Sequence, residues 1–382
     1  MRLCKVEVFQ ANLSLRTGIE SANETHMERP VTFVKITTDS VEGWGESSAL
    51  IAGTSVDPPA AYITEVLKEK VVPSVVGIVR ERDGELPDSA TVTRQLLKDG
   101  DHPLAVACME MALLDAELLE EKLSLPEKIG SNGTKVSVGT VLGIPSSRDL
   151  GQLISEVDRA LESGWARIRL KVRPGWDVAP AFAVRRRFTD LCFQIDCNGS
   201  YSPLSVRSEI PSLWREIDSL GLACIEQPFA AHDLESHAVL AAAIDTPVCL
   251  DETLTSTAAL ERAIDVGACE IACLKPARLG GVAAARTALD LCGRRGIPAF
   301  VGGFFETGLA RSVNVAVAGL AEVSMPSDVG APLGYLREAP FSFQWGSTGV
   351  FDIPQTPVPG LGSHCEEAIF NEFATTVLTQ DL

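Results

Sequence analysis

Five charged residues, each at the end of a short apolar run, recur along the middle of the chain at nearly constant spacing. They are Lys171, Asp196, Glu226, Asp251 and Lys275, and the intervals between them are 25, 30, 25 and 24 residues. About that many residues form a strand, a turn, a helix and a return turn in a barrel of eight such units. Charges at the same phase of this repeat would all lie at one end of the barrel. The spacing therefore predicts one site, with three carboxylates between two lysines.

Hydrophobic patterning beyond residue 130 supports the same architecture. Segments with apolar residues at helical spacing alternate with short β-type runs. The expected helix and strand pairs are 147–163 with 167–172, 253–263 with 270–275, and 281–295 with 298–302. This alternation predicts an α/β fold with a parallel sheet, closed most economically into a barrel. An open doubly wound sheet is the alternative, although no Gly-x-Gly-x-x-Gly fingerprint supports nucleotide binding in it.

The two ends of the chain have a different pattern. Short β-type runs at 5–9, 31–37 and 41–45 are typical of an antiparallel meander, and helical segments follow them up to 102–120. Strands followed by helices indicate a separate α+β domain. The tail is rich in Pro and Gly, and we expect it to return to that domain. The predicted division is an α+β capping domain over 1–130, the barrel over 131–340, and a C-terminal return over 341–382.

Charge and composition argue against several classes of function. The net charge of −18 disfavours nucleic acid or an anionic membrane as a partner. No run of about 18 uncharged apolar residues is present to span a bilayer, and Lys5 and Glu7 interrupt the start where a signal peptide needs an apolar run. Most of the ten cysteines lie in apolar runs, Cys192 and Cys273 among them, and none forms a Cys-x-x-Cys pair. We therefore expect buried free thiols and a cytoplasmic location.

Three carboxylates between two lysines suit metal-assisted proton abstraction. Asp196, Glu226 and Asp251 offer hard oxygen ligands, which favour Mg²⁺, with Mn²⁺ as the alternative. The set contains no His or Cys, and this argues against zinc. A carboxylate substrate bound to such a cation becomes acidic at its α-carbon, and a lysine can remove that proton. Lys275 would approach the substrate from the side opposite to Lys171. Two opposed lysines permit either proton relocation or elimination.

Two neighbouring residues share faces with this set. Arg169 lies two residues before Lys171, and alternate residues of a strand point the same way. A like charge and partial burial beside Lys171 would favour its neutral form, which is the form that acts as a base. Asn198 shares the face of Asp196 for the same geometric reason.

Each residue of the set, taken singly, could have an ordinary structural role. A carboxylate at a strand end often caps the next helix, so capping of a helix that begins near Thr253 is the alternative for Asp251. A lone lysine after an apolar run often extends into solvent. We expect Glu252 and Asp233 to be solvated residues of this ordinary kind. Only the ordered set of five favours a common site.

A later strand ends in a glycine-rich segment that contains Gly302 and Gly303. Glycine lets a backbone approach a ligand closely, although a packing corner explains these two nearly as well. Glu306 either faces the site or caps the next helix. Asp328 has the same two interpretations at the last strand.

Seven short motifs, in order along nearly the whole chain, resemble the enolase superfamily and specifically its muconate-lactonizing subgroup. They are Val41–Glu46, Met109–Ala116, Arg169–Lys171, Asp196–Asn198, Ile225–Pro228, Leu250–Glu252 and Leu274–Arg278. The motifs are most similar to those of the o-succinylbenzoate synthase and N-acylamino-acid racemase family. The resemblance implies that the barrel is a (β/α)7β modified TIM barrel with an α+β capping domain.

The resemblance implies a role for each of the five charged residues. The three acids would bind Mg²⁺, Lys171 would act as general base and acid, and Lys275 would be the lysine on the opposite face. Arg278 is similar to an arginine of family members that have racemase activity. Arg169 stands where the family usually has a lysine. Segments 15–29 and 47–58, expected to cover the site, are not typical, so the resemblance leaves the distal part of the substrate undetermined.

The resemblance further implies a lyase that dehydrates its substrate to o-succinylbenzoate, a step of menaquinone synthesis, through an enediolate intermediate. The alternatives are an N-acylamino-acid racemase, acting for instance on N-succinylamino acids, or another acid-sugar or cycloisomerase member. The expected partner is a small carboxylate, and we also expect a homo-oligomer.

Two functions outside this chemistry stay open. A glycosidase barrel would use Glu226 and Asp251 without a metal, but Lys171, Lys275 and an aromatic content of only 6% argue against it. A barrel kept as a binding module would bind metal without turnover.

Overall fold

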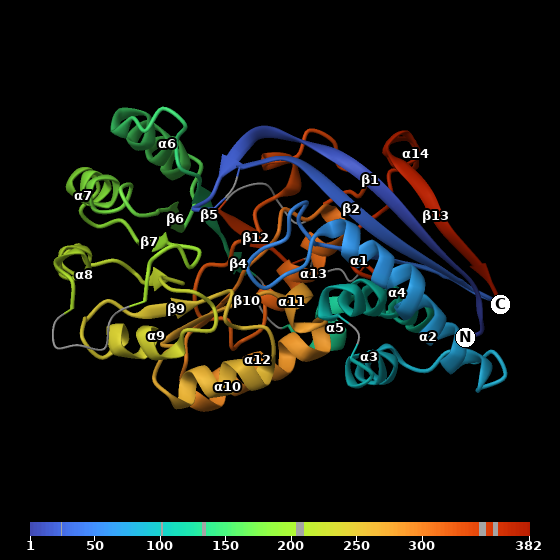
Figure 1. The fold of residues 1–382 in the computed structure, drawn as a ribbon. Helices are drawn as coiled ribbons and strands as arrows, with labels where there is room; N and C mark the ends of the chain where they lie inside the picture. Colours follow the sequence, from blue (N-terminus) through green and yellow to red (C-terminus); the bar gives the residue numbers. More distant parts are fainter. Residues whose placement is uncertain (24, 101, 132–134, 204–209, 344–348, 354–357) are drawn as a thin grey trace.

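Two main sheets organise the chain, and Figure 1 shows an antiparallel sheet at the right with the barrel at the left. The computed structural model describes all residues except 24, 101, 132–134, 204–209, 344–348 and 354–357. Parts of the Pro- and Gly-rich tail expected as a return therefore lie outside the described residues. Both ends of the chain lie together at the far edge of the antiparallel sheet, where Leu382 N donates to Cys4 O at 3.0 Å.

The barrel sheet has seven parallel strands in the spatial order β11-β10-β9-β8-β7-β6-β5. The strands are β5 (Gly139–Leu142), β6 (Arg167–Lys171), β7 (Phe193–Asp196), β8 (Ile225–Glu226), β9 (Val248–Leu250), β10 (Ile271–Leu274) and β11 (Ala299–Val301). An eighth position closes the ring as a single parallel bridge between Val138 and Ser327, while Asp328 N donates to Val301 O at 2.8 Å. The predicted (β/α)7β barrel is confirmed.

Helices follow these strands along the chain and surround the ring. In the described part of the chain they are α6 (Leu150–Glu162), α7 (Val178–Arg187), α8 (Ser212–Asp218), α9 (Leu234–Ala241), α10 (Thr257–Asp265), the short α11 (Pro276–Leu279), α12 (Val282–Arg295) and α13 (Gly308–Ala318). Most begin at a side-chain cap, and Ser256 caps α10 by accepting from Ala259 N. The observed helix α10 therefore begins four residues after the start of the helix predicted over 253–263.

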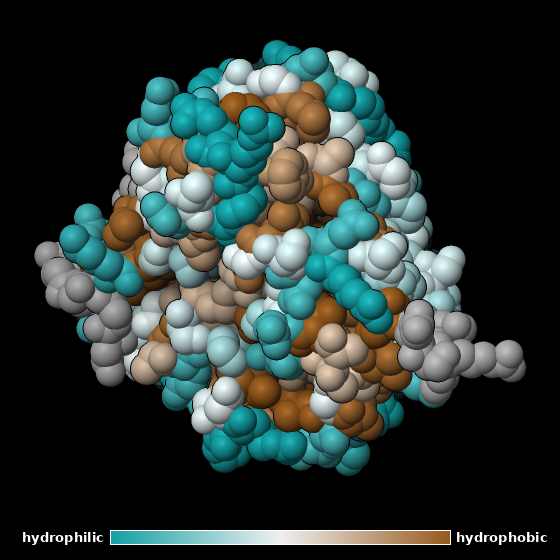
Figure 2. Space-filling model, turned by 90° about the vertical axis from the view of Figure 1, so that its left-hand side faces the viewer, coloured by the Kyte–Doolittle hydropathy of each residue, from teal (hydrophilic) through white to brown (hydrophobic). Residues whose placement is uncertain are grey.

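On the face of the barrel drawn in Figure 2, apolar residues form several separate patches among polar ones.

The antiparallel sheet has the order β13-β1-β2-β3. Its strands are β1 (Leu3–Glu20), β2 (Thr25–Thr38), β3 (Glu42–Ser47) and β13 (Ala374–Asp381). The helices of this part are α1 (Ala60–Val66), η1 (Leu67–Val71), α2 (Val72–Arg80), α3 (Ser89–Lys98), α4 (Pro103–Glu121), α5 (Leu125–Ile129) and α14 (Glu367–Phe373). The pairing of β1 with β2 continues to Glu20 and Thr25. Segment 15–29, expected as a covering loop, is therefore mostly the far end of a long hairpin.

The C-terminal tail contacts both parts of the molecule. β13 pairs with β1 in the capping sheet, as the expected return requires. β12 (Val350–Asp352) instead pairs with β4 (Lys135–Ser137), just before the first barrel strand. The boundaries at 130 and 340 stay a prediction.

Helix α4 fixes the capping sheet against the barrel. Gly45 of β3 lies so close to α4 that a Cβ there would be 1.9 Å from Cys108 O, so only glycine fits. Asp115 accepts from Trp44 N at 3.0 Å, and Glu110 accepts from Val282 N, the first residue of α12, at 3.0 Å. One helix thereby holds the sheet on one side and a barrel helix on the other.

All ten cysteines are free, and seven of them are buried. Cys192 is exposed, which corrects the expectation that it is buried, because it lies in the turn before β7 rather than in a strand. Within the described residues no helix is both long and apolar enough to cross a membrane.

Candidate active site

The five charged residues lie at the carboxyl ends of five consecutive strands, β6 to β10. The register pairs Lys171 with Asp196, and Asp196 with Glu226. Asp251 and Lys275 directly follow β9 and β10. Active sites of parallel barrels form at this end. The structure therefore brings together the set that the spacing predicted, with a lysine at each end of the row.

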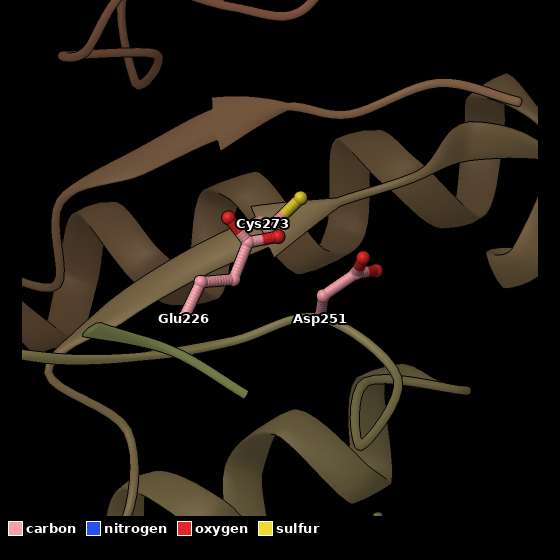
Figure 3. Close-up of side chains that lie close together, drawn as sticks. All are labelled: Glu226, Asp251 and Cys273. Atoms are coloured by element: carbon pink, nitrogen blue, oxygen red, sulfur yellow. The ribbon is translucent and has the colours of Figure 1, made fainter. Parts of the chain in front are cut away.

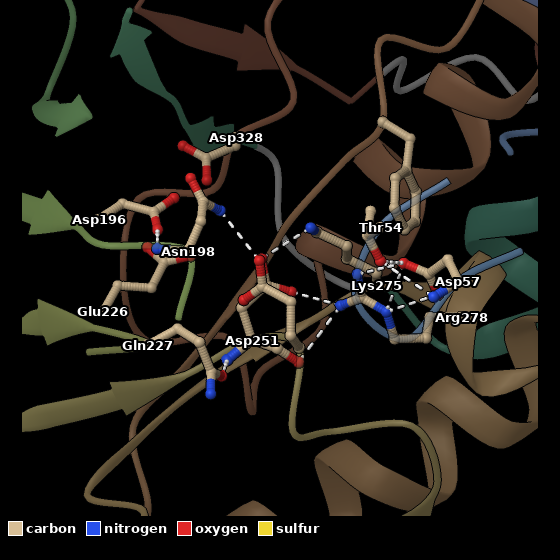
Figure 4. Close-up of polar contacts among 12 residues, drawn as sticks. Thr54, Asp57, Asp196, Asn198, Glu226, Gln227, Asp251, Lys275, Arg278 and Asp328 are labelled. Atoms are coloured by element: carbon tan, nitrogen blue, oxygen red, sulfur yellow. Dashed lines mark hydrogen bonds and ion pairs between the residues drawn. The ribbon is translucent and has the colours of Figure 1, made fainter. Parts of the chain in front are cut away.

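Each lysine is bonded to the carboxylate beside it. Lys171 Nζ donates to Asp196 Oδ2 at 2.6 Å, and Lys275 Nζ donates to Asp251 Oδ2 at 2.7 Å. The three acids are at most 1% exposed. Figure 4 shows them side by side at the strand ends.

The acid cluster fits a hard divalent cation. Glu226, Asp251 and Cys273 each offer a ligand atom within 4.8 Å of the others. Figure 3 shows these three side chains close together. Burial, together with the neighbouring carboxylates of Asp196 and Asp251, raises the pKa of Glu226 to about 8, although the charge of Arg169 acts to lower it. Burial also raises the pKa of the Cys273 thiol well above its usual value, which favours oxygen donors over sulfur. Asp196 is not among these three residues; its Oδ2 accepts from Lys171 Nζ.

Arg169 links the acids from inside the barrel. Its Nη1 donates to Glu226 Oε1 at 2.6 Å, and its Nη2 lies 2.8 Å from Asp328 Oδ2. Asp328 also pairs with Arg167 at 2.7 Å, so it faces the barrel interior and does not cap a helix. The guanidinium of Arg169 is thus occupied by carboxylates, whereas the sequence suggested a like charge acting mainly on Lys171.

The Lys275 end of the row is enclosed by cationic and aromatic groups. Arg278 donates through Nη1 to Asp251 Oδ1 and through Nη2 to Asp57 Oδ2 at 2.7 Å. The ring of Phe304 lies 4.5 Å from Lys275 Nζ and 5.1 Å from the Arg278 guanidinium carbon. Burial acts to lower the pKa of Lys275, but the charges of Asp251, Glu252 and the other acidic groups around it together leave that pKa above its usual value.

Two family models cover most of the chain. Residues 3–130 match the N-terminal domain of the mandelate racemase and muconate lactonizing enzymes, and residues 152–369 match the enolase C-terminal domain-like family. The chain belongs to the enolase superfamily. Its members are enzymes that use a divalent metal, and the buried carboxylates described above are a possible site for one.

Relatives and solved structures agree with this assignment. The chain is 35% identical over 366 residues to the N-succinylamino acid racemase of Amycolatopsis sp., with 95% of each chain covered. It is 31% identical over 372 residues to the o-succinylbenzoate synthase of Bacillus subtilis, covering 97% of this chain and 96% of that one. An enolase-superfamily structure from Enterococcus faecalis V583 superposes with a TM-score of 0.86 at 28% identity, covering 100% and 99%.

In this enolase-superfamily barrel, Gln227 organises the strand ends, and the spacing of charged residues did not single it out. It has a positive φ of 40° directly after Glu226 and is fully buried. Its Oε1 accepts from Asp251 N at 3.0 Å and from Thr253 N at 3.2 Å. The segment after Asp251 therefore turns around this amide, and capping of a helix by Asp251 is excluded. The sequence signal that could have pointed to Gln227 is its position between Glu226, a predicted metal ligand, and Pro228.

Asn198 and Glu252 form a second polar link. Asn198 Oδ1 accepts from Lys171 Nζ at 3.0 Å, and its Nδ2 donates to Glu252 Oε1 at 2.9 Å. Glu252 is 6% exposed, so its prediction as a solvated residue is wrong; it directly follows a strand-end acid and turns inward. Asp233 does have an ordinary role, because it caps α9 by accepting from Ser236 N at 3.0 Å.

The glycine-rich segment after β11 supports the site through packing. A Cβ on Gly302 would lie 2.7 Å from Cys273 Sγ and 3.0 Å from Lys275 Cε. A Cβ on Gly303 would lie 2.8 Å from Glu306 Oε2. Glu306 pairs with Arg311 and accepts from Phe304 N at 2.8 Å, while Thr307 caps α13. Glu306 therefore stabilises the segment after β11 through these contacts, and the prediction that it caps the next helix is not met.

Proposed function

We propose that this enzyme removes the proton α to a carboxylate with the help of a divalent cation, and that its reaction is dehydration to o-succinylbenzoate in menaquinone synthesis. The observation that supports the proposal most strongly is the position of the two lysines. They follow the two outer strands of a row of five, and Lys171 bonds Asp196 while Lys275 bonds Asp251. A substrate carbon held over Glu226 would have one amine on each face.

In this proposal the three acids Asp196, Glu226 and Asp251 would hold Mg²⁺. When bound, the cation would withdraw charge from the substrate carboxylate, acidify the α-carbon and stabilise the enediolate. Lys171 removes the α-proton as a base and then donates it, as an acid, to the departing hydroxyl group, which leaves as water. Lys275 stays protonated on the opposite face and stabilises the negative charge that develops.

Racemisation of N-succinylamino acids is the second candidate. It is favoured by the contact of Arg278 with Asp251, the carboxylate that holds Lys275, because a second positioned lysine is what a two-base reaction needs. The similarity to the racemase of Amycolatopsis sp. supports it as well. In this reaction each lysine removes the proton from one face and the other lysine returns a proton to the opposite face.

Two assays in D₂O test these candidates. Purified enzyme with Mg²⁺ is given the hydroxylated succinyl-cyclohexadiene carboxylate or a single enantiomer of N-succinylphenylalanine. An aromatic product supports dehydration, whereas α-deuterium with inverted configuration supports racemisation. Lys171→Ala should abolish dehydration, and the exposed-pair variant Lys68→Ala should keep wild-type rates. Full dehydration by Lys171→Ala, or no reaction of wild type with either substrate, would contradict the proposal.

A further inference from the structure

Two segments of the capping domain reach the barrel at opposite ends of the lysine row, each through an acid. Glu20, at the end of β1, pairs with Arg148 at 2.6 Å and with Arg173 at 3.2 Å on the loops after β5 and β6. Asp57, in the loop between β3 and α1, pairs with Arg278 after β10. One contact therefore lies toward Lys171 and the other toward Lys275.

The loop that carries Asp57 is folded tightly around that carboxylate. Thr54 Oγ1 donates to Asp57 Oδ2 at 2.8 Å, and Asp57 N donates back to Thr54 Oγ1 at 3.0 Å. Gly53 has a φ of 78°, and a Cβ there would lie 2.3 Å from Asp57 O. The short segment 53–57 is thus shaped to hold one carboxylate in one direction.

Asp57 and Arg278 form a two-point ion pair between the domains, as Figure 4 shows. Arg278 Nε donates to Asp57 Oδ1 at 3.0 Å, and its Nη2 donates to Oδ2 at 2.7 Å. Asp57 is 5% exposed and Arg278 is 3% exposed. A planar guanidinium held along one edge has a fixed orientation.

The other nitrogen of the same guanidinium acts on the catalytic end. Nη1 donates to Asp251 Oδ1 and to Asp251 O, the latter at 3.2 Å. The remaining oxygen, Oδ2, accepts from Lys275 Nζ at 2.7 Å. The orientation that Asp57 gives to Arg278 therefore sets the rotation of the Asp251 carboxylate, and this rotation sets where the Lys275 amine lies.

We propose that Asp57 is a positioning residue for Lys275, so that the lysine is correctly placed only when loop 47–58 is docked on the barrel. This inference rests on the proposed function, because it assigns Lys275 to one face of the substrate. It predicts that the two lysines are controlled separately: the Asp57 contact acts on the Lys275 face, and the Glu20 contact does not.

Face-specific α-proton exchange tests the inference. Exchange of each enantiomer of N-succinylphenylalanine is followed in D₂O, and Lys275→Ala identifies the enantiomer whose proton Lys275 removes. Asp57→Ala should lower exchange of that enantiomer roughly 10- to 100-fold, with Asp57→Asn intermediate. In an Arg278→Ala background Asp57→Ala should have no further effect. Glu20→Gln, which breaks the matching contact at the other end, should leave exchange of that enantiomer unchanged.

Hydrogen–deuterium exchange of backbone amides gives a readout that does not depend on activity. Asp57→Ala and Arg278→Ala should each reduce protection of residues 47–58, and Glu20→Gln should leave it unchanged. Equal losses for both enantiomers, additive effects of the Asp57 and Arg278 changes, or full protection of the loop in Asp57→Ala would each overturn the inference. No exchange of either enantiomer by wild type would instead contradict the racemase candidate. Amide protection of residues 47–58 would then be the measurement that tests whether Asp57 docks this loop on the barrel.

Discussion

Gln227 joins two of the proposed metal ligands, because it follows one and holds the backbone of the other. Gln227→Met removes the acceptor for two buried N–H groups at 3.0 and 3.2 Å. We expect a loss of about 2 kcal/mol in the free energy of unfolding and a roughly 10- to 100-fold weaker affinity for Mn²⁺. Chemical denaturation and calorimetric titration measure the two effects, and Gln95→Met on the surface of α3 is the control. Unchanged Mn²⁺ affinity would make Gln227 a purely structural residue.

The site residues that the sequence predicted are placed by local periodicity, whereas those it missed are placed by contacts between segments distant in sequence. Lys171, Glu226 and Lys275 end apolar runs, so periodicity alone places them at one end of a barrel. Asp57 gains its partner from a residue 221 positions away, a contact that depends on how two domains dock. Glu252 directly follows Asp251, a proposed metal ligand, and only the turn around Gln227 decides that it faces inward.

At the scale of single elements, α4 makes stability depend on pH. Burial raises the pKa of Glu110 from 4.5 to about 7, against two backbone N–H donors that lower it. Below about pH 4.5 the folded and unfolded states both hold the proton, and between the two values only the folded state does. The free energy of unfolding should therefore fall as pH rises from about 4.5 to 7 and then level off, by on the order of 3 kcal/mol for this group.

Glu110→Gln tests this pH dependence, because its amide oxygen can still accept from Val282 N while the titration is gone. Denaturation at pH 5 to 8 should show a flatter profile for the variant than for wild type. Asp115, whose pKa burial also raises to about 7, contributes a second slope that Asp115→Asn should remove. Identical profiles for wild type and both variants would contradict the assignment.

The lengths of elements were harder to predict than their order. In β1 the alternation of Ala11, Leu13 and Leu15, all buried, continues past the predicted strand, so the signal for a long hairpin was present. The start of α10 was set too early because the turn after β9 depends on a tertiary contact of Thr253 with Gln227.

At the scale of the whole molecule, the barrel fold follows from the regular spacing of the five charged strand ends. Removal of the metal tests whether the reaction of this barrel depends on a divalent cation. EDTA should abolish activity, and Mg²⁺ should restore it. Mg²⁺ at a hundredfold excess over its dissociation constant should stabilise the folded chain by about 2.7 kcal/mol, an effect that Glu226→Gln should largely remove. Calorimetry measures the shift. Activity that survives EDTA would contradict the proposed metal-assisted reaction.

The most direct test of the account is a crystal structure with Mg²⁺ and a bound carboxylate ligand. The account predicts one cation coordinated at about 2.1 Å by Asp196, Glu226 and Asp251. It also predicts the amines of Lys171 and Lys275 on opposite faces of the ligand's α-carbon. A cation bound elsewhere, or both amines on one side of the ligand, would contradict it.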